Sequence, residues 1–289
     1  MTIRNRMAPY LFIAPFFILF FLFWFWPVLF SIFLSNTDWS GVGKPEFNNL
    51  RNFVNLINDS VFHITVRNTL YIAVASILII APLALLLAIL LNNRLIKFSD
   101  AIRLAIFLPV VMSLVVASMI FLNLLDYNAG ILKYWLGLIG LKMPDLLSSE
   151  KLSMPTLIGI LIWRWTGYNM LFFLAGLQSI PKDVLEAAKI DGANNFQTFI
   201  YVTFPMLKPV TIFVIVQSLI GAFQVFEEPL IITGGGPAYS SLTMALYLYN
   251  RAFRNLRFGY ASAVALIQFV LILLLSIFAL KVTGAFKKE

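Results

Sequence analysis

Six long apolar stretches alternate with shorter polar segments along the chain. They cover residues 10–34, 69–91, 104–125, 155–177, 209–226 and 260–280. Each can cross a hydrocarbon core about 30 Å thick, which requires about 20 helical residues at a rise of 1.5 Å each. The pattern therefore predicts an all-α membrane protein with six transmembrane helices, organised as a single domain over residues 1–289.

The first apolar stretch could be a secretory signal, because Arg4 and Arg6 precede it. It is about twice as long as the apolar region of a usual signal and lacks a small-residue cleavage site. It also contains Trp24, Trp26 and Pro27. We interpret it as a retained span, and the even number of spans then places both termini on the same side.

A polar loop over residues 178–208 joins the fourth and fifth spans. Pro181 favours the start of a helix, because a proline in the first turn loses no hydrogen bond. The helix is expected to end at Gly192, a residue suited to that position, and a second short helix follows with Phe196 and Phe199 in its apolar stripe. This arrangement predicts a docking element for a protein partner at the membrane surface; a connector lying on lipid is the alternative.

Composition supports the membrane interpretation. Apolar residues make up 61% of the chain and charged residues 12%, against about 25% charged in soluble domains. The chain has no cysteine and a single histidine, His63, which excludes a disulfide framework and leaves no histidine-built metal site. The net charge of +8 is spread over the loops, so we expect contact with anionic lipid and not with nucleic acid.

No nucleotide-binding or catalytic motif is present. The phosphate-binding pattern G-x-x-x-x-G-K-[ST] does not occur, so we predict that the chain is not an enzyme and carries no cofactor of its own. Glu227 and Glu228 are adjacent at the outer end of the fifth span. Because neighbouring residues point in different directions, we interpret them as part of a solvated rim and not as an acid/base couple.

Lysine and arginine positions give the orientation, since these residues are enriched in cytoplasmic loops. With both termini inside, the inside cations are Arg4, Arg6, Arg94, Lys97, Arg103, Lys182, Lys189, Lys208, Lys281, Lys287 and Lys288. The outside cations are Lys44, Arg51, Arg67, Lys133, Lys142, Lys151, Arg251, Arg254 and Arg257. The small excess inside favours cytoplasmic termini.

Polar residues within the spans are candidates for a substrate pathway, because they are costly in lipid. Gln217 and Gln224 are two helical turns apart in the fifth span, with Gly221 on the same stripe. Tyr168 lies in the fourth span. Amide, hydroxyl and aromatic groups suit a sugar, while hydrogen bonds between helices are the alternative role. Arg164, also in the fourth span, is expected to pair with a carboxylate or to line water, and a phosphate-bearing substrate is a lesser possibility.

The loop sequence resembles a known family. Residues 186–205 read EAAKIDGANNFQTFIYVTFP, which is similar to the EAA signature of permease subunits of binding-protein-dependent ABC importers. Val202 and Phe204 stand where that family usually has Ile and Leu. WRWTGYNMLFFLAGLQSIP over residues 163–181 and TGGGP over 233–237 resemble the carbohydrate, maltose-type branch. The similarity extends over roughly residues 65–285.

The resemblance implies how the chain works and with which partners. It implies that Glu186, Ala187, Ala188, Asp191 and Gly192 belong to a cytoplasmic coupling helix that docks on an ATPase subunit, and that Tyr168, Gln217, Gly221 and Gln224 fall near sugar-contact positions. The expected partners are a second homologous permease, two ATPase subunits that bind ATP and Mg²⁺, an extracytoplasmic sugar-binding protein and membrane lipid.

The expected function is import of a sugar, most simply an oligosaccharide, as a multi-pass subunit of a bacterial or archaeal cytoplasmic (inner) membrane. Import of glycerol phosphate or a polyol is the alternative within the family. An ion-coupled secondary carrier is a further alternative, but it would need an acidic residue within its spans. All acidic residues of this chain lie in loops or at span ends.

Overall fold

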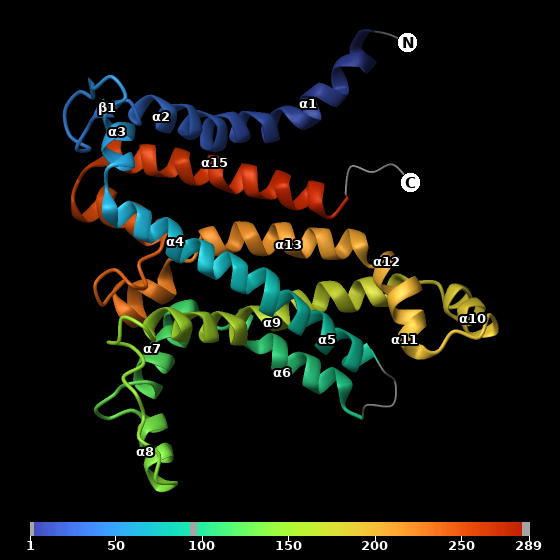
Figure 1. Ribbon diagram of the computed structural model, residues 1–289. Coiled ribbons are helices and arrows are strands. Elements are labelled where there is room, and N and C mark those ends of the chain that lie inside the picture. Colours follow the sequence, from blue (N-terminus) through green and yellow to red (C-terminus); the bar gives the residue numbers. More distant parts are fainter. Residues whose placement is uncertain (1–2, 93–96, 285–289) are drawn as a thin grey trace. The chain divides into compact units, whose positions relative to one another are not determined.

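The computed structural model describes residues 3–92 and 97–284 (Figure 1). The described residues are mostly helical, which confirms the predicted all-α class. The chain divides into two compact units: Met1–Asp59 with Leu248–Val270, and Ser60–Tyr247 with Leu271–Glu289. The orientation prediction used three cations that lie outside the described residues: Arg94, Lys287 and Lys288. It also used Arg4 and Arg6, whose side chains are not described.

An apolar helix and a polar end make up the first unit. The helix passes through α1 (Ile3–Phe20), the π-helical turn η1 (Phe21–Phe25) and α2 (Trp26–Leu34), and Pro9–Leu34 is long and apolar enough to cross a membrane. The other elements are β1 (Thr37–Asp38), its antiparallel partner β2 (Glu46–Phe47), α3 (Arg51–Ile57), η5 (Asn250–Arg254) and the first half of α15 (Phe258–Val282).

Hydrogen bonds hold the polar end of the first unit together. The buried amide of Asn52 donates to the carbonyl oxygens of Ser35 and Thr37 at 3.0 and 2.9 Å. The carboxylate of Asp59 accepts from the guanidinium of Arg251 at 3.2 Å. These bonds connect segments that are far apart in the sequence.

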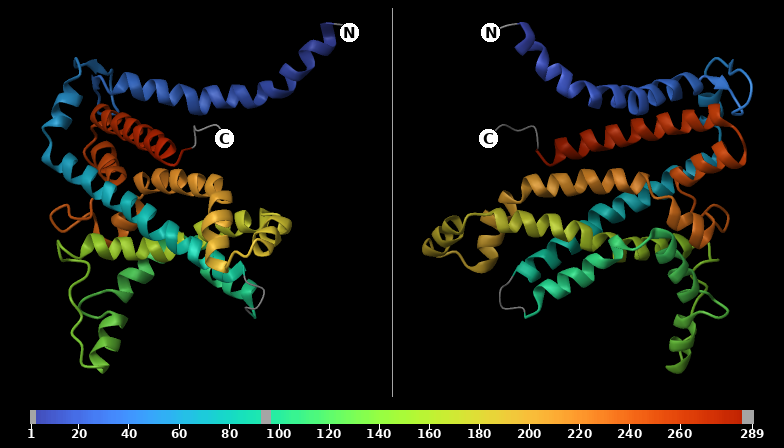
Figure 2. Two further views of the ribbon diagram at one scale, coloured as in Figure 1. Left: turned by 45° about the vertical axis from the view of Figure 1, so that its right-hand side comes forward. Right: turned by 180° about the vertical axis from the view of Figure 1, so that it is seen from behind.

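Two long helices organise the second unit (Figures 1 and 2). One runs through α4 (Ser60–Ala75), the π-helical turn η2 (Ser76–Ile80) and α5 (Ala81–Asn92), and the other is α9 (Ser153–Ser179). The remaining elements are α6 (Ser99–Val111), α7 (Leu114–Leu124), α8 (Ile131–Leu138), α10 (Lys182–Ile190), α11 (Asn195–Thr198), η3 (Phe199–Thr203), α12 (Phe204–Met206), α13 (Lys208–Phe223), η4 (Pro229–Thr233) and α14 (Met244–Tyr249).

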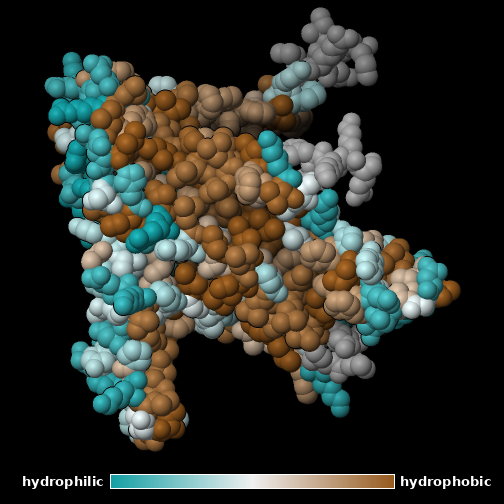
Figure 3. All heavy atoms as spheres, in the orientation of Figure 1, coloured by the Kyte–Doolittle hydropathy of each residue, from teal (hydrophilic) through white to brown (hydrophobic). Residues whose placement is uncertain are grey.

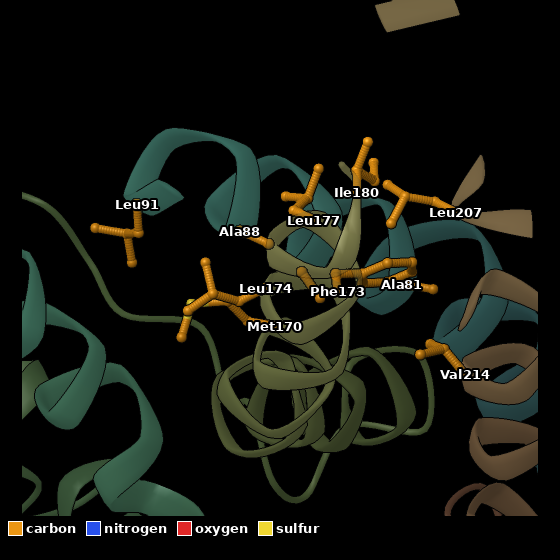
Figure 4. Close-up of a cluster of buried hydrophobic side chains, with 11 residues drawn as sticks. Ala81, Ala88, Leu91, Met170, Phe173, Leu174, Leu177, Ile180, Leu207 and Val214 are labelled. Carbon is orange, nitrogen blue, oxygen red and sulfur yellow. The ribbon is translucent and has the colours of Figure 1, made fainter. Parts of the chain in front are cut away.

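Small side chains on α5 allow it to lie close to α9. Ala84 and Ala88 are one helical turn apart and fully buried. They belong to a cluster with Met170 and Phe173 of α9 and Val214 of α13 (Figure 4). Helices in lipid associate mainly through such close packing, because lipid tails are as apolar as the side chains they would replace. This cluster fixes α9 and α13 next to each other, and the candidate site described below lies on these two helices.

The third predicted span is not one straight helix, contrary to the prediction for residues 104–125. α6 and α7 meet at an angle of 96°. Met112 has extended backbone (φ −65°, ψ 142°), and Pro109 has no backbone N–H to donate to the preceding turn. α6 alone is 13 residues, or about 20 Å, which is too short to cross a hydrocarbon core.

Helices cover the other predicted spans to within a few residues, with two exceptions. The helix of the second span begins at Ser60 and not at residue 69, and α13 ends at Phe223 after a bend of 64° from the preceding Asn195–Met206 segment. The described residues contain four helices suited to cross a membrane, or up to six if each bent pair is one span. Within the second unit, Figure 3 shows apolar side chains along the helices and hydrophilic ones around α10 and α11.

Candidate functional site

The loop between α9 and α13 forms a sharp corner at the predicted glycine. α10 begins directly after Pro181 and ends at Ile190, and Gly192 has φ +83°. The N–H of Gly192 bonds to the carbonyl of Lys189, and the N–H of Ala193 to that of Ala188, both at 3.0 Å. This pair of bonds is a Schellman motif, which ends a helix and usually has glycine at the left-handed position.

A capping box starts the next helix immediately. The side chain of Asn194 accepts from the N–H of Gln197 at 2.8 Å, and the side chain of Gln197 accepts from the N–H of Asn194 at 2.9 Å. The sequence prediction did not include this feature, although the N-x-x-Q spacing is its signature. The Schellman motif and the capping box together fix the direction of both short helices.

The predicted coupling residues lie on one side of this corner. Glu186 and Ala187 are exposed, Ala188 is half-buried, and Asp191 follows the last residue of α10. Leu185 packs against the core of the second unit. Ile190 (85% exposed) and Phe196 (74% exposed) present apolar surface outward. The loop is therefore anchored on one face and offers a mixed charged and apolar surface on the other.

A cavity of about 220 Å³ lies in the second unit and is lined by all four predicted sugar-site residues. Tyr168 comes from α9, Gln217 and Gly221 from α13, and Gln224 from the residue that ends α13. A Cβ atom built on Gly221 would meet no other atom within 4 Å. The glycine therefore leaves room for a ligand and is not needed for helix packing.

Within the described part of the chain, the two glutamine amides have no hydrogen-bond partner. Gln217 and Gln224 are both exposed, and no bond joins either side chain to another described residue. The alternative that they link helices within this chain is therefore not supported. Tyr168 is held by edge-to-face contacts with Trp165 (5.7 Å between ring centroids) and Phe172 (4.9 Å).

Glu228 differs from the sequence interpretation. It is 4% exposed and lines the cavity together with the half-buried Glu227, so Glu228 is not part of a solvated rim. Glu228 follows the end of α13, and burial raises the pKa of its carboxyl, partly opposed by its own backbone N–H and by the charge of Arg164. The sequence prediction missed the burial of Glu228, because the adjacency of two residues does not show which of their side chains is buried.

Arg164 stabilises the bend between α6 and α7. Its Nη2 atom lies 3.5 and 3.4 Å from the carbonyl oxygens of Val110 and Met112, which the break leaves without helical partners. Arg164 is 6% exposed, and in the described structure it forms no ion pair and does not line the cavity. The expected direct ion pair with a carboxylate is therefore not present among the described residues, although the charge of Arg164 acts on Glu228. That Arg164 lines water stays a prediction.

The sequence prediction also missed several cavity residues. Trp165 and Ser218 contribute to the wall, and the Ser218 hydroxyl is buried without a partner among the described residues. Trp165 lies three residues, about one helical turn, before Tyr168, and Ser218 lies three residues before Gly221. Helical spacing from the predicted residues could have identified both Trp165 and Ser218.

The chain combines helices long and apolar enough to span a membrane, a fixed corner in a polar loop and a cavity that carries a few polar groups, and these features are typical of a membrane transport subunit. Residues 80–284 match the family described as "Binding-protein-dependent transport system inner membrane component". The chain belongs to this family, and the predicted resemblance is confirmed.

Relatives cover nearly the whole chain. It is 36% identical, over 99% of this chain and 91% of the other, to the arabinooligosaccharides transport system permease protein AraP of Bacillus subtilis strain 168. It is 39% identical to the lactose transport system permease protein LacF of Rhizobium radiobacter (92% and 91% covered). It is 34% identical to the sn-glycerol-3-phosphate transport system permease protein UgpA of Agrobacterium fabrum strain C58 (95% and 94% covered).

A solved structure shares the fold. The chain superimposes with a TM-score of 0.86 and 24% identity on a chain of a bacterial alginate ABC transporter, solved in complex with an alginate pentasaccharide-bound periplasmic protein. The superposition covers 99% of this chain and 97% of the other.

Proposed function

We propose that the chain is the sugar-translocating permease subunit of an ATP-driven importer in a bacterial or archaeal inner membrane. The observation that carries the proposal is the cavity, which brings Tyr168, Gln217, Gly221 and Gln224 together. Its amides have free donors and acceptors, as sugar hydroxyls require, and its rings offer faces for C–H groups. The names of two relatives, for arabinooligosaccharides and lactose, agree with a saccharide.

The loop corner supports coupling to a separate ATPase. α10 is held by Leu185 on its inner face and by the Schellman motif at its end, and the capping box fixes the start of α11. A displacement of α10 by the ATPase would therefore be transmitted to α9 and α13. Glu186 would pair with a basic residue of the ATPase, and Ala187 would permit close approach. ATP and Mg²⁺ would be bound by the ATPase, because the chain has no phosphate-binding motif.

A second, homologous permease would complete the pathway. Gln217 and Gln224 are exposed on this chain, so one side of the cavity is open. A partner helix placed there would enclose the sugar, and an extracytoplasmic binding protein would deliver it, as the family description implies.

Orientation is tested with two matched cysteine variants, since the chain contains no cysteine. Lys182→Cys at the start of α10 is expected to react with a membrane-impermeant thiol reagent only from the cytoplasmic side. Lys142→Cys, in the loop after α8, is expected to react only from outside. Both lysines are exposed, so access depends on the side alone. The opposite pattern would refute docking of α10 on a cytoplasmic ATPase.

The sugar site is tested by changing the two amides. Gln217→Leu and Gln224→Leu each remove polar partners for a buried hydroxyl, which costs about 1–3 kcal/mol per group. Affinity measured from uptake against sugar concentration should fall roughly tenfold to hundredfold. Gly221→Leu should abolish uptake, because its side chain would occupy the cavity.

The matched control is Gln178→Leu. Gln178 is an exposed glutamine at the end of α9 and does not line the cavity, so its replacement should leave affinity within about twofold of wild type. Unchanged affinity in both cavity variants would remove the fifth span of this subunit from the sugar site and point to the partner permease.

Import of glycerol phosphate is the second candidate, favoured by the similarity to UgpA. It would need a cation facing the ligand. Arg164, the basic residue nearest in the fourth span, binds backbone carbonyls and lies outside the cavity wall. The cavity therefore supports the sugar better.

A further inference from the structure

Two carboxylates form part of the cavity wall. Glu227 and Glu228 both line the cavity that carries Trp165 and Tyr168. Glu228 is almost completely buried. Within the described residues neither carboxylate forms an ion pair, so no cation neutralises them by direct contact.

The positive charge that acts on Glu228 belongs to a residue that does not line the cavity. The charge of Arg164 acts on Glu228, but the Nη2 atom of Arg164 is directed at the carbonyl oxygens that end α6. Its Nε and Nη1 atoms are buried without a partner in the described structure. A ligand inside the cavity therefore meets negative groups, while the compensating cation is out of its reach.

The chemistry of these groups favours one class of sugar. An ionised carboxylate only accepts hydrogen bonds, and sugar hydroxyls can donate to it. A carboxylate or phosphate on the ligand would place a like charge beside Glu227 and Glu228, and like charges at contact distance repel. Burial disfavours the charged form of Glu228, so its contribution to this repulsion is smaller than its position alone would give.

We propose that Glu227 and Glu228 make this cavity selective for uncharged, hydroxyl-rich saccharides and exclude saccharides that carry carboxylate or phosphate groups. The proposal rests on the proposed function, because it assumes that the sugar occupies this cavity. It adds a substrate class, and it separates the two candidate functions, since glycerol phosphate belongs to the excluded class.

The test uses the purified complex of both permeases and both ATPases, without the binding protein, so that only the membrane site is measured. A panel of neutral di- to tetrasaccharides and uronate oligosaccharides of equal length is titrated, and binding is followed by the rise in melting temperature. The wild-type complex should bind its best neutral saccharide at least about tenfold more tightly than the matching uronate.

Glu227→Gln and Glu228→Gln keep the side-chain shape and remove the charge. Glu227→Gln should tighten uronate binding by about tenfold and Glu228→Gln by a smaller factor, and each should change neutral binding by less than about threefold. Glu150→Gln, an exposed position outside the cavity, should change neither. Melting of the ligand-free variants shows that they are folded.

The outcomes separate the two claims. If neutral saccharides bind but both glutamine variants keep the wild-type preference within twofold, the carboxylates do not select the substrate and the sugar site stands. If the wild-type complex binds the uronate with the same affinity as the neutral saccharide, the proposed selectivity against charged saccharides is wrong. If no saccharide in the panel binds, the proposed sugar cavity is wrong and the selectivity falls with it.

Discussion

Gly167→Ala is expected to destabilise the permease by about 1–3 kcal/mol or more, the usual cost of overpacking. A Cβ atom at Gly167 would overlap the backbone carbonyl of Ile106 on α6. Because the overlap is with backbone, no side chain can move to relieve it, and α6 must shift away from α9. The measurement is the melting temperature of the purified complex, together with the amount of assembled complex in the membrane.

Gly159→Ala is the matched control on the same helix. A Cβ atom there would meet nothing within 4 Å, and alanine favours a helix over glycine by about 0.5–1 kcal/mol. This variant should be as stable as wild type or more stable. Equal melting temperatures for the two variants would show that α6 does not pack closely on α9 at Gly167.

Gly192→Val is expected to uncouple transport from ATP hydrolysis. Gly192 has φ +83° with open space around it, so the cost comes from the backbone alone and is about 1–2 kcal/mol for a branched residue. That cost changes the population of the correct corner by roughly 5- to 30-fold. Uptake should fall by a similar factor while the protein remains in the membrane.

Two further variants identify the cause. Gly192→Asn should keep most of the uptake, because asparagine tolerates the left-handed conformation. Gly140→Val introduces the same strain at φ +74°, also in open space, but in the loop after α8. It should leave coupling intact. Normal uptake by Gly192→Val would contradict the role of the corner.

The sequence was sufficient to predict features that depend on local chemistry. Apolar runs located the spans, Pro181 and Gly192 located the ends of α10, and helical spacing placed Gln217 and Gln224 on one stripe. Each of these follows from the residue itself or from neighbours within two turns. Gln217, Gly221 and Gln224 share one stripe of α13 for that reason, whereas Tyr168 reaches the same cavity from α9 through packing between the two helices.

Features that depend on tertiary contacts could not be predicted. The bend at Met112 leaves backbone carbonyl oxygens without helical hydrogen bonds. Arg164, about 50 residues later in the sequence, donates a hydrogen bond to the carbonyl oxygen of Met112. The burial of Glu228 depends on helices that pack around it, and its neighbour in sequence gives no sign of this. Both cases concern a charged residue whose environment is built by distant segments.

ATP-driven sugar accumulation in proteoliposomes would show whether this chain translocates sugar. Vesicles would contain this chain, its partner permease and the ATPase subunits, with binding protein and labelled sugar outside and ATP inside. The account predicts accumulation of sugar that requires ATP and disappears when this chain is omitted or carries Gly221→Leu. Accumulation that persists with Gly221→Leu, or an intact complex that accumulates no saccharide in the presence of ATP, would contradict it.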